Sequence, residues 1–343
     1  MPTNLSRLFP YRIFKPPIME KFLSCDWGTS SFRLRLVEIA SNKIITEDSS
    51  DQGIAKVFES WREAGQQGSL RFAFFLERIA QSIQSMEGRM NYSFEKYPLI
   101  ISGMACSTLG MVELPYKDVP FSTDGSDLVT QIIAADNDFK HDIIFISGAR
   151  TENDAMRGEE TQLIGCIHNE QEQVYIFPGT HSKHVFVKNG KVLDIKTYMT
   201  GEFFALLSEK SILSASIERT NKIKTEKDNA FEAGVKESLL SNLLNSSFKV
   251  RTNHLFQKFS PQENFRYLSG LLIGTELKEL TGVNYGITLV TNSYLCSQYE
   301  AAYRLVMNGT NRLKIQNADE AMIKGQLKVL NRMIKEKHFF DGI

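Results

Sequence analysis

Asp26-Trp27-Gly28-Thr29-Ser30-Ser31-Phe32-Arg33 lies between two apolar runs, Phe22–Cys25 and Leu34–Ile39. The runs predict two strands, and in the second run leucines alternate with Arg35. Gly28 suits a tight turn between the strands, because glycine has no side chain to restrict the backbone. The stretch therefore predicts a strand, a turn and a strand; a polar hairpin tip without a ligand is the alternative.

The polar residues of this turn are of the kinds that bind a nucleotide phosphate. A carboxylate at the end of the first strand, Asp26, can hold a hydrated Mg²⁺. Gly28 lets the backbone approach a phosphate closely, and Thr29 and Ser30 offer hydroxyl and backbone N–H donors to its oxygens. Arg33 adds a fixed positive charge. These five residues are therefore candidates for metal and phosphate binding.

A second strand–turn–strand unit begins about 150 residues after the first. Val174–Phe177 and His184–Val187 are apolar runs on either side of Pro178-Gly179-Thr180-His181-Ser182-Lys183. Asn189-Gly190 then predicts a type I′ hairpin. Two turns of this kind in one chain favour duplicated halves that face one nucleotide, with a chance similarity of two hairpin tips as the alternative.

The second turn repeats the donor chemistry of the first. Gly179, Thr180 and Ser182 are candidates for phosphate binding, and Lys183 adds a positive charge. His181 is a candidate for contact with a phosphate or a substrate, with a purely structural turn histidine as the alternative. The two turns together therefore predict a site for the phosphates of a nucleotide.

Composition limits the class of protein. The 343 residues are enough for two domains, and 40 basic residues balance 40 acidic ones. This balance argues against nonspecific binding to nucleic acid or to an anionic membrane. No stretch approaches the roughly 20 consecutive apolar residues of a membrane span. The expected partners are therefore small molecules, with a homodimer left open.

The four cysteines favour free thiols. Cys25, Cys106, Cys166 and Cys296 are widely scattered, and no Cys-x-x-Cys pair is present. This spacing argues against a structural zinc site and favours buried thiols in a reducing compartment. We therefore expect a cytoplasmic protein.

Composition also suggests the domain limits. Residues 1–18 contain basic residues and no acid, but lack the apolar core of a secretory signal, so we expect a disordered extension. The wholly polar stretch His168–Gln173 predicts a boundary between one domain over residues 19–170 and another over residues 171–343.

Strands alternate with helices along the chain, which predicts an α/β fold with a largely parallel element. The patterns favour strands at Pro98–Gly103 and His141–Ser147, and helices at Leu70–Ile83 and Gly125–Ala135. Beyond the second turn we expect a strand over Tyr285–Asn292 and helices over Gly201–Ser214, Asn229–Asn245, Glu263–Leu280 and Ala318–Lys335.

The segment Asp154–Ile167 is the predicted helix on which a catalytic base would lie. Thr151 and Asp154 resemble an N-terminal capping box. Gly158 inside a helix costs about 1 kcal/mol relative to Ala, and close approach of a ligand would explain it. A charged, solvated helix start is the alternative.

Two adjacent carboxylates of this helix are candidates for the base. Glu160 shares a helix side with Leu163, whereas Glu159 and Gln162 lie on another side. We therefore expect Glu159 to accept the proton of an attacking hydroxyl, Glu160 to have a structural or sugar-orienting role, and Gln162 to contact the substrate.

Arg150 and Arg157 flank the start of this helix. Arginine binds carboxylates through two parallel hydrogen bonds, so either residue is a candidate for the carboxylate of an acid sugar. Ordinary surface arginine is the alternative.

Several segments resemble the 2-dehydro-3-deoxygalactonokinase family. Met156-Arg157-Gly158-Glu159-Glu160-Thr161-Gln162-Leu163 and Pro178-Gly179-Thr180-His181-Ser182-Lys183 are the strings specific to that family. The Asp-x-Gly-Thr turn is shared with the wider superfamily of actin, hexokinase and glycerol kinase. Further similar segments are Ser102–Tyr116, Tyr198–Leu207 and Tyr267–Gly274, and the resemblance spans residues 22 to about 340.

The resemblance implies two ribonuclease-H-like domains with ATP in the cleft between them, the actin-like ATPase fold. It implies Mg²⁺-dependent transfer of the γ-phosphoryl group to the 6-hydroxyl of 2-dehydro-3-deoxy-D-galactonate, in galactonate catabolism. In related kinases a Gly-Asp pair before a helix supplies the base, and Gly158-Glu159 resembles it. One departure is that Ile287–Thr291 continues into Asn292–Cys296 without the glycine-rich turn of such kinases. A catalytically inactive sugar- or nucleotide-responsive binding protein is the alternative.

Overall fold

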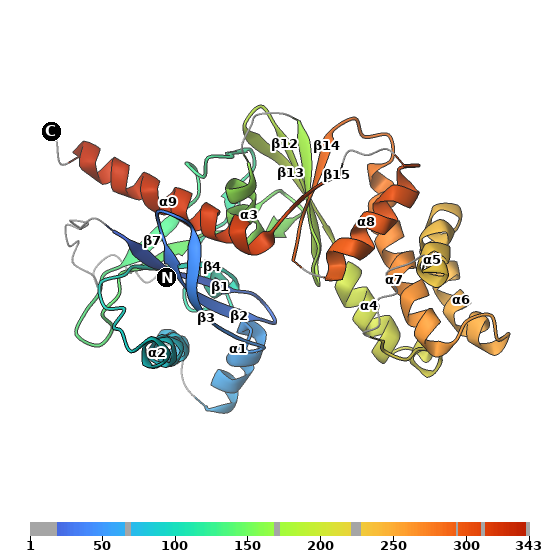
Figure 1. Ribbon diagram of the computed structural model, residues 1–343, viewed down its shortest axis with the longest axis horizontal. Helices are drawn as coiled ribbons and strands as arrows, with labels where there is room; N and C mark the ends of the chain where they lie inside the picture. Colours follow the sequence, from blue (N-terminus) through green and yellow to red (C-terminus); the bar gives the residue numbers. More distant parts are fainter. Residues whose placement is uncertain are drawn as a thin grey trace. The chain divides into compact units, whose positions relative to one another are not determined.

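The computed structural model describes residues 19–65, 70–167, 172–220, 228–292, 294–309 and 313–340 (Figure 1). The predicted extension at residues 1–18 lies outside these ranges, as do residues 168–171 of the polar boundary stretch. The contacts divide the chain into two compact units. Unit 1 contains the described residues up to 167, Gly190–Leu193 and the chain from Asp319 on; unit 2 contains residues 172–189 and Asp194–Ala318. The C-terminal segment thus belongs to unit 1, in contrast to the domain expected over residues 171–343.

A six-stranded mixed sheet forms the centre of unit 1, in the order β3-β2-β1-β4-β8-β7. β1 pairs antiparallel with β2 and parallel with β4, which is itself parallel to β8. The strands are β1 (Lys21–Trp27), β2 (Phe32–Glu38), β3 (Lys43–Ser50), β4 (Leu99–Gly103), β7 (Thr130–Ile133) and β8 (Ile143–Ile146). This confirms the predicted strand–turn–strand at Asp26–Arg33.

Two helices contribute to the core of unit 1, α1 (Ile54–Glu63) and α2 (Arg71–Met90). The buried side chains of α2 are Phe75, Ile79, Ile83 and Met86, at helical spacing. They join the apolar side chains of β1 and β4 in one cluster, and each such buried side chain contributes about 1.5–3 kcal/mol. The helix predicted over Leu70–Ile83 is therefore confirmed.

The helix predicted over Gly125–Ala135 is wrong. Residues 123–127 form turns in which the carboxylates of Asp124 and Asp127 accept from the N–H groups of Ser126 and Ser122. These local hydrogen bonds compete with a helix. The following β-branched residues form β7, which pairs antiparallel with β8.

The helix predicted from Asp154 begins later. Ala155–Met156 is a short strand, β10, paired antiparallel with β9 (Ala149–Arg150), which is parallel to β5 (Lys117–Asp118). The Thr151 hydroxyl oxygen accepts from the N–H groups of Asn153 and Asp154, so it closes a turn and caps no helix. α3 runs over Glu159–Cys166, and Gly158 is its N-cap residue.

α9 (Ala318–Phe340) packs closely against α3 within unit 1. A Cβ atom at Gly325 would lie 1.8 Å from the Thr161 carbonyl oxygen, and one at Gly165 would lie 1.9 Å from that of Ala321. The Lys328 ammonium donates to two carbonyls at the end of α3. These contacts explain why the C-terminal segment belongs to unit 1.

Unit 2 repeats the topology of unit 1. Its sheet has the order β15-β14-β11-β12-β13, with β14 parallel to both β11 and β15 and with β12 antiparallel to β11. The strands are β11 (Gln173–Phe177), β12 (Ser182–Lys188), β13 (Lys191–Tyr198), β14 (Gly286–Val290) and β15 (Leu313–Gln316). Asn189 and Gly190 both have positive φ, as the predicted type I′ turn requires. The duplicated-halves prediction is therefore confirmed at the level of topology.

In unit 1, β6 (Phe121–Ser122) pairs antiparallel with Lys191 and Val192, with which β13 begins. The helices of unit 2 are α4 (Thr200–Glu209), α5 (Asn229–Leu240), α6 (Leu243–Leu255), α7 (Pro261–Leu277) and α8 (Tyr294–Val306). α5 and α7 approach closely, because Cβ atoms at Gly234 and Gly270 would each lie 2.1 Å from a carbonyl oxygen of the opposite helix.

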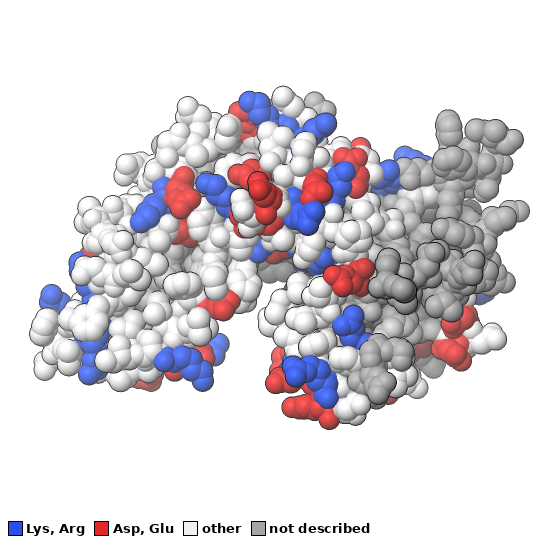
Figure 2. Space-filling model, turned by 180° about the vertical axis from the view of Figure 1, so that it is seen from behind, with Lys and Arg blue, Asp and Glu red and all other residues white. Residues whose placement is uncertain are grey.

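Basic and acidic side chains are interspersed on the face shown in Figure 2, as the even charge balance suggests. Within the described part of the chain, no helix is both long and apolar enough to cross a membrane.

Candidate active site

The first turn presents two exposed residues, Thr29 and Ser30. The Gly28 N–H donates to the Ser31 carbonyl at 2.9 Å, which closes the turn. The carbonyls of Gly28 and Thr29 accept from the first two N–H groups of α1. A Cβ atom at Gly53 would lie 2.2 Å from the Thr29 carbonyl oxygen, so glycine there allows helix and turn to meet. The backbone of the turn is thus held against the start of α1, and the hydroxyl groups of Thr29 and Ser30 are exposed to a ligand.

Asp26 is the second last residue of β1, with 14% of its side chain exposed. Arg33 lies opposite in the β1–β2 register and its guanidinium is 3.4 Å from the Asp26 carboxylate. Burial raises the pKa of Asp26 above its ordinary value, Arg33 and Arg35 oppose this, and Asp319 adds to it. Asp26 is therefore a carboxylate in a crowded charge environment, and Arg33 is its partner.

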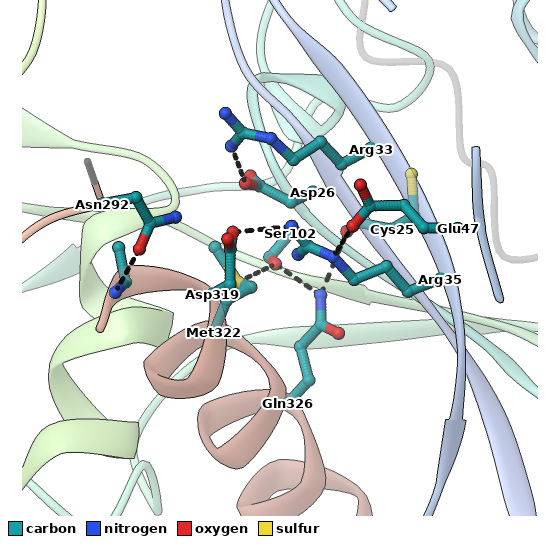
Figure 3. A network of polar contacts seen from close by, with 11 residues as sticks. Cys25, Asp26, Arg33, Arg35, Glu47, Ser102, Asn292, Asp319, Met322 and Gln326 are labelled. Atoms are coloured by element: carbon teal, nitrogen blue, oxygen red, sulfur yellow. Dashed lines mark hydrogen bonds and ion pairs between the residues drawn. The ribbon is translucent and has the colours of Figure 1, made fainter. Parts of the chain in front are cut away.

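Arg35 is a residue that the sequence pattern did not identify as part of the site. It alternates with leucines in β2, and only 1% of its side chain is exposed. Its Nε donates to Glu47 at 2.5 Å and its Nη2 to Asp319 at 2.6 Å (Figure 3). Arg35 thus joins β2, β3 and the first turn of α9, and it places Asp319 in the surroundings of Asp26.

One amide, Gln326, completes the network shown in Figure 3, and a second amide drawn there, Asn292, forms a separate contact. Gln326 on α9 donates to the Cys25 carbonyl at 3.0 Å and to the Ser102 hydroxyl oxygen at 2.8 Å, so it joins the ends of β1 and β4. The Asn292 side chain accepts from the N–H of Ala318 within unit 2. Asn292 thus caps the first N–H group of α9.

The residues around Asp26 fit a hydrated divalent cation. Asp26 and Asp319 are two partly exposed carboxylates, and the negative charge of Asp319 raises the pKa of Asp26. Mg²⁺ in kinases is typically held by one or two carboxylates together with substrate phosphates and water. In the part of the chain that the structure describes, no group of three or more His, Cys, Asp or Glu side chains could hold a metal by itself.

Three backbones meet at the carboxyl edge of the unit 1 sheet and bring α3 to Asp26. Trp27 is in register with Gly103, and a Cβ atom at Gly103 would lie 2.7 Å from the Trp27 carbonyl oxygen. A Cβ atom at Gly158 would in turn lie 3.3 Å from the Gly103 Cα. Gly158 has φ +115°, which favours glycine independently. The start of α3, with Glu159, therefore lies at the edge where β1 ends.

Glu159 and Glu160 have different surroundings. Glu159 is half-buried and accepts from the Arg157 N–H at 3.0 Å. Glu160 is fully buried, and it accepts from the Gly158 N–H at 2.7 Å and from the Thr161 hydroxyl at 3.0 Å. Burial, and next the Glu159 carboxylate, raises the pKa of Glu160 to about 8. Glu160 is thus held inside the fold while Glu159 remains reachable.

The structure separates the two candidate arginines. The Arg157 guanidinium is buried, stacks on the Tyr116 ring at 3.9 Å and donates to the carbonyls of Cys106 and Leu114. Arg150 is exposed on β9 and donates to Asp118 at 2.6 Å. It lines an open groove in unit 1 together with Asp118, Val119 and residues 151–155. Only Arg150 is therefore placed to meet a solute; Gln162 is half-buried on α3.

The second turn matches the first in exposure. Gly179, Thr180 and His181 are exposed, whereas Ser182 and Lys183 are buried. His181 forms a hydrogen bond with Glu202, the third residue of α4. The sequence stage treated Ser182 as a direct phosphate donor, but its hydroxyl donates into the protein, to Glu276 at 2.6 Å.

A cavity of about 310 Å³ adjoins this turn within unit 2. Its walls are mainly apolar, and the polar groups among them come from the side chains of Thr180, Thr200, Ser269, Gln298 and Tyr299. Gly179 and Thr180 form one edge, and α4, α7 and α8 supply the remainder. An apolar cavity with a few polar groups beside a phosphate-type turn has the composition of a base-binding pocket.

Comparisons with known proteins agree over most of the chain. The family model for 2-keto-3-deoxy-galactonokinase matches residues 26–329. The chain is 28% identical to the 2-dehydro-3-deoxygalactonokinase of Escherichia coli (strain K12), over 83% of this chain and 89% of that protein. It is 30% identical to a Rhizobium meliloti (strain 1021) protein named "Probable 2-dehydro-3-deoxygalactonokinase", over 89% and 94%. A crystal structure of a Sinorhizobium meliloti protein described in similar terms superposes with a TM-score of 0.72 at 26% identity, covering 91% and 96%.

Proposed function

Because the chain belongs to the 2-keto-3-deoxy-galactonokinase family, we propose that it transfers the γ-phosphoryl group of ATP to the 6-hydroxyl of 2-dehydro-3-deoxy-D-galactonate. The protein is a carbohydrate kinase with an actin-like ATPase fold. One observation carries the proposal beyond the family match: each unit has a Gly-Thr turn at the same place in its topology, between its first two strands.

The exposed parts of both turns bind the phosphates of ATP. Thr29 and Ser30 in unit 1 and Gly179 and Thr180 in unit 2 offer N–H and hydroxyl donors. Phosphoryl transfer needs little covalent help from a protein, so positioned donors supply most of the catalysis. The cavity beside the second turn takes the adenine base, because its walls are apolar and Gln298 and Ser269 provide polar contacts.

Asp26 and Asp319 would hold Mg²⁺ in this scheme, together with the phosphates of ATP and water. The cation supplies neutralisation of the charge that develops on the transferred group. Arg35, whose side chain is buried, keeps Asp319 in place through an ion pair, and Arg33 keeps Asp26 oriented.

Glu159 accepts the proton of the 6-hydroxyl as its oxygen attacks the γ-phosphorus. The new O–P bond forms while the bond to the β-phosphate oxygen breaks, and ADP leaves with that electron pair. Glu159 is suited because it is half-buried at the sheet edge that bears Asp26. Glu160 stays inside the fold as a neutral neighbour, since its pKa is raised to about 8. Arg150 binds the sugar-acid carboxylate, because it is the exposed arginine of the pair.

Glu159→Gln tests the assignment, because it keeps the size of the side chain and removes the base. We expect kcat to fall by roughly 10²–10⁴-fold, the usual effect of losing a general base, with ATP affinity little changed. Glu77→Gln is the matched control, because Glu77 is an exposed glutamate of α2 in the same unit and does not line the groove of Arg150. Activity within a few-fold of wild type in Glu159→Gln would show that the base lies elsewhere.

A further inference from the structure

A buried carboxylate lies directly behind the second turn. Glu276 of α7 is 1% exposed, and four polar side chains surround it. Its Oε1 accepts from the Ser182 hydroxyl at 2.6 Å and from the His184 ring at 3.0 Å. Its Oε2 accepts from the Thr200 hydroxyl at 2.5 Å and from the Tyr299 hydroxyl at 2.8 Å.

These four contacts fill all the hydrogen-bond acceptor positions of the Glu276 carboxylate. An ionised carboxylate has two oxygens with two lone-pair positions each, and each Glu276 oxygen receives two donors. A buried carboxylate is costly unless its acceptor positions are filled, and here all of them are. The Glu276 carboxylate therefore has no free acceptor position for water or a ligand.

The network joins the elements that surround the proposed nucleotide. Ser182 is the first residue of β12, directly after the turn, and Thr200 is the first residue of α4. Thr200 and Tyr299 also line the cavity of about 310 Å³, together with Gly179 and Thr180 of the turn. One carboxylate thus holds the end of the phosphate turn and two walls of the base pocket.

The start of α4 is itself packed on the turn. A Cβ atom at Gly201 would lie 2.6 Å from the Gly179 carbonyl oxygen, and the Glu202 N–H donates to the Thr180 carbonyl at 3.0 Å. Any shift of Thr200 is therefore passed to the exposed turn through backbone contacts. Because closely packed backbones transmit strain, we expect a change at Glu276 to alter the turn.

We propose that Glu276 is a positioning residue for nucleotide binding, which fixes the phosphate turn and the base pocket in one geometry through Ser182, Thr200 and Tyr299. This inference rests on the proposed function in so far as the ligand is ATP. It predicts that losing the carboxylate lowers nucleotide affinity, since an unsatisfied buried donor reorganises its surroundings. Binding of the sugar acid should stay unchanged, because Arg150 and Glu159 belong to unit 1.

Isothermal titration calorimetry with the non-hydrolysable analogue AMP-PNP and Mg²⁺ tests the inference without turnover. Glu276→Gln keeps the size of the side chain but replaces one acceptor oxygen by a donor, so we expect the Kd to rise about tenfold or more. In steady-state kinetics, KM for ATP should rise with it, while KM for the sugar acid stays within twofold. Glu279→Gln is the matched control, an exposed glutamate three residues later that also accepts from a tyrosine hydroxyl, and it should bind as wild type does.

Two further variants keep the inference testable if Glu276→Gln does not fold. Thr200→Val and Tyr299→Phe each remove one hydroxyl and leave three donors on the carboxylate. Each should raise the Kd of AMP-PNP severalfold, and an unchanged Kd in both folded variants would overturn the positioning role. If Glu276→Gln lowers the melting temperature and leaves Kd and KM unchanged, Glu276 only stabilises the fold, and the positioning role is likewise overturned. Wild-type protein that binds AMP-PNP but phosphorylates no sugar acid would contradict the proposed function and leave this test intact.

Discussion

Glu160→Gln should change how the stability of unit 1 depends on pH. In the folded chain the Glu160 carboxyl is fully buried and its pKa is raised to about 8, whereas the ordinary value is 4.5. Between these two values the unfolded chain has lost the proton and the folded chain still binds it. The free energy of unfolding must therefore fall as pH rises through this window, and the loss is complete above the folded pKa. Glutamine mimics the neutral carboxyl and cannot ionise, so the variant lacks this loss.

The size of the effect follows from the width of the window. One bound proton corresponds to 1.36 kcal/mol per pH unit, and the window spans about 3.5 pH units, so the loss is at most about 5 kcal/mol. At pH 4.5 and below, wild type and variant should have similar stability, since both side chains are neutral. At pH 8 the variant should be the more stable by several kcal/mol.

Tryptophan fluorescence reports this unit alone, because the two tryptophans of the chain, Trp27 and Trp61, both lie in unit 1. Guanidinium unfolding followed by fluorescence at pH 5, 6, 7 and 8 gives the free energy at each pH. Glu152→Gln changes an exposed glutamate of the same unit, and its free energy of unfolding should depend on pH as that of wild type does. A difference between Glu160→Gln and wild type that stays constant from pH 5 to 8, or that shrinks, would refute the buried neutral carboxyl.

Three further substitutions test other parts of the account. Asp26→Ala should abolish turnover and weaken AMP-PNP binding only modestly in calorimetry; near-normal turnover at saturating Mg²⁺ would exclude Asp26 as the metal carboxylate. Arg157→Ala should lower the free energy of unfolding by about 2–4 kcal/mol, since it leaves two buried carbonyls without donors, and should leave KM for the sugar acid unchanged; a strongly raised KM in folded protein would return Arg157 to the substrate site. Gly325→Ala should destabilise unit 1 by about 3 kcal/mol or more in guanidinium unfolding, whereas Gly88→Ala, with open space around it, should not; equal stability of the two would contradict the close contact of α9 with α3.

The strand–turn–strand motifs were predictable because their signals are local. Apolar runs, a glycine turn and Asn189-Gly190 determine their own conformation over a few residues, and both hairpins form as expected. The helix expected over Gly125–Ala135 was wrong because aspartate and serine side chains satisfied the backbone locally. Apolar content alone could not distinguish that helix from a β-branched strand.

The charge network of the site could not be predicted, because its members are distant in sequence. Arg35 and Asp319 are separated by 284 positions, and each has an ordinary local context, a strand alternation and a helix N-terminus. Glu276 likewise lies within an apolar helix and gives no motif of its own. Gly158 was correctly identified as unusual, but its reason is a positive φ and the contact with Gly103, which only the fold supplies.

The central claim is that the chain phosphorylates a 2-keto-3-deoxy sugar acid with ATP. A coupled assay of ADP release from the wild-type protein with Mg²⁺ and a panel of such acids tests it most directly, with acid-free reactions as the blank. We expect turnover with 2-dehydro-3-deoxy-D-galactonate well above the blank. AMP-PNP binding together with no turnover on any acid of the panel would contradict the claim and indicate a nucleotide-responsive binding protein on the same fold.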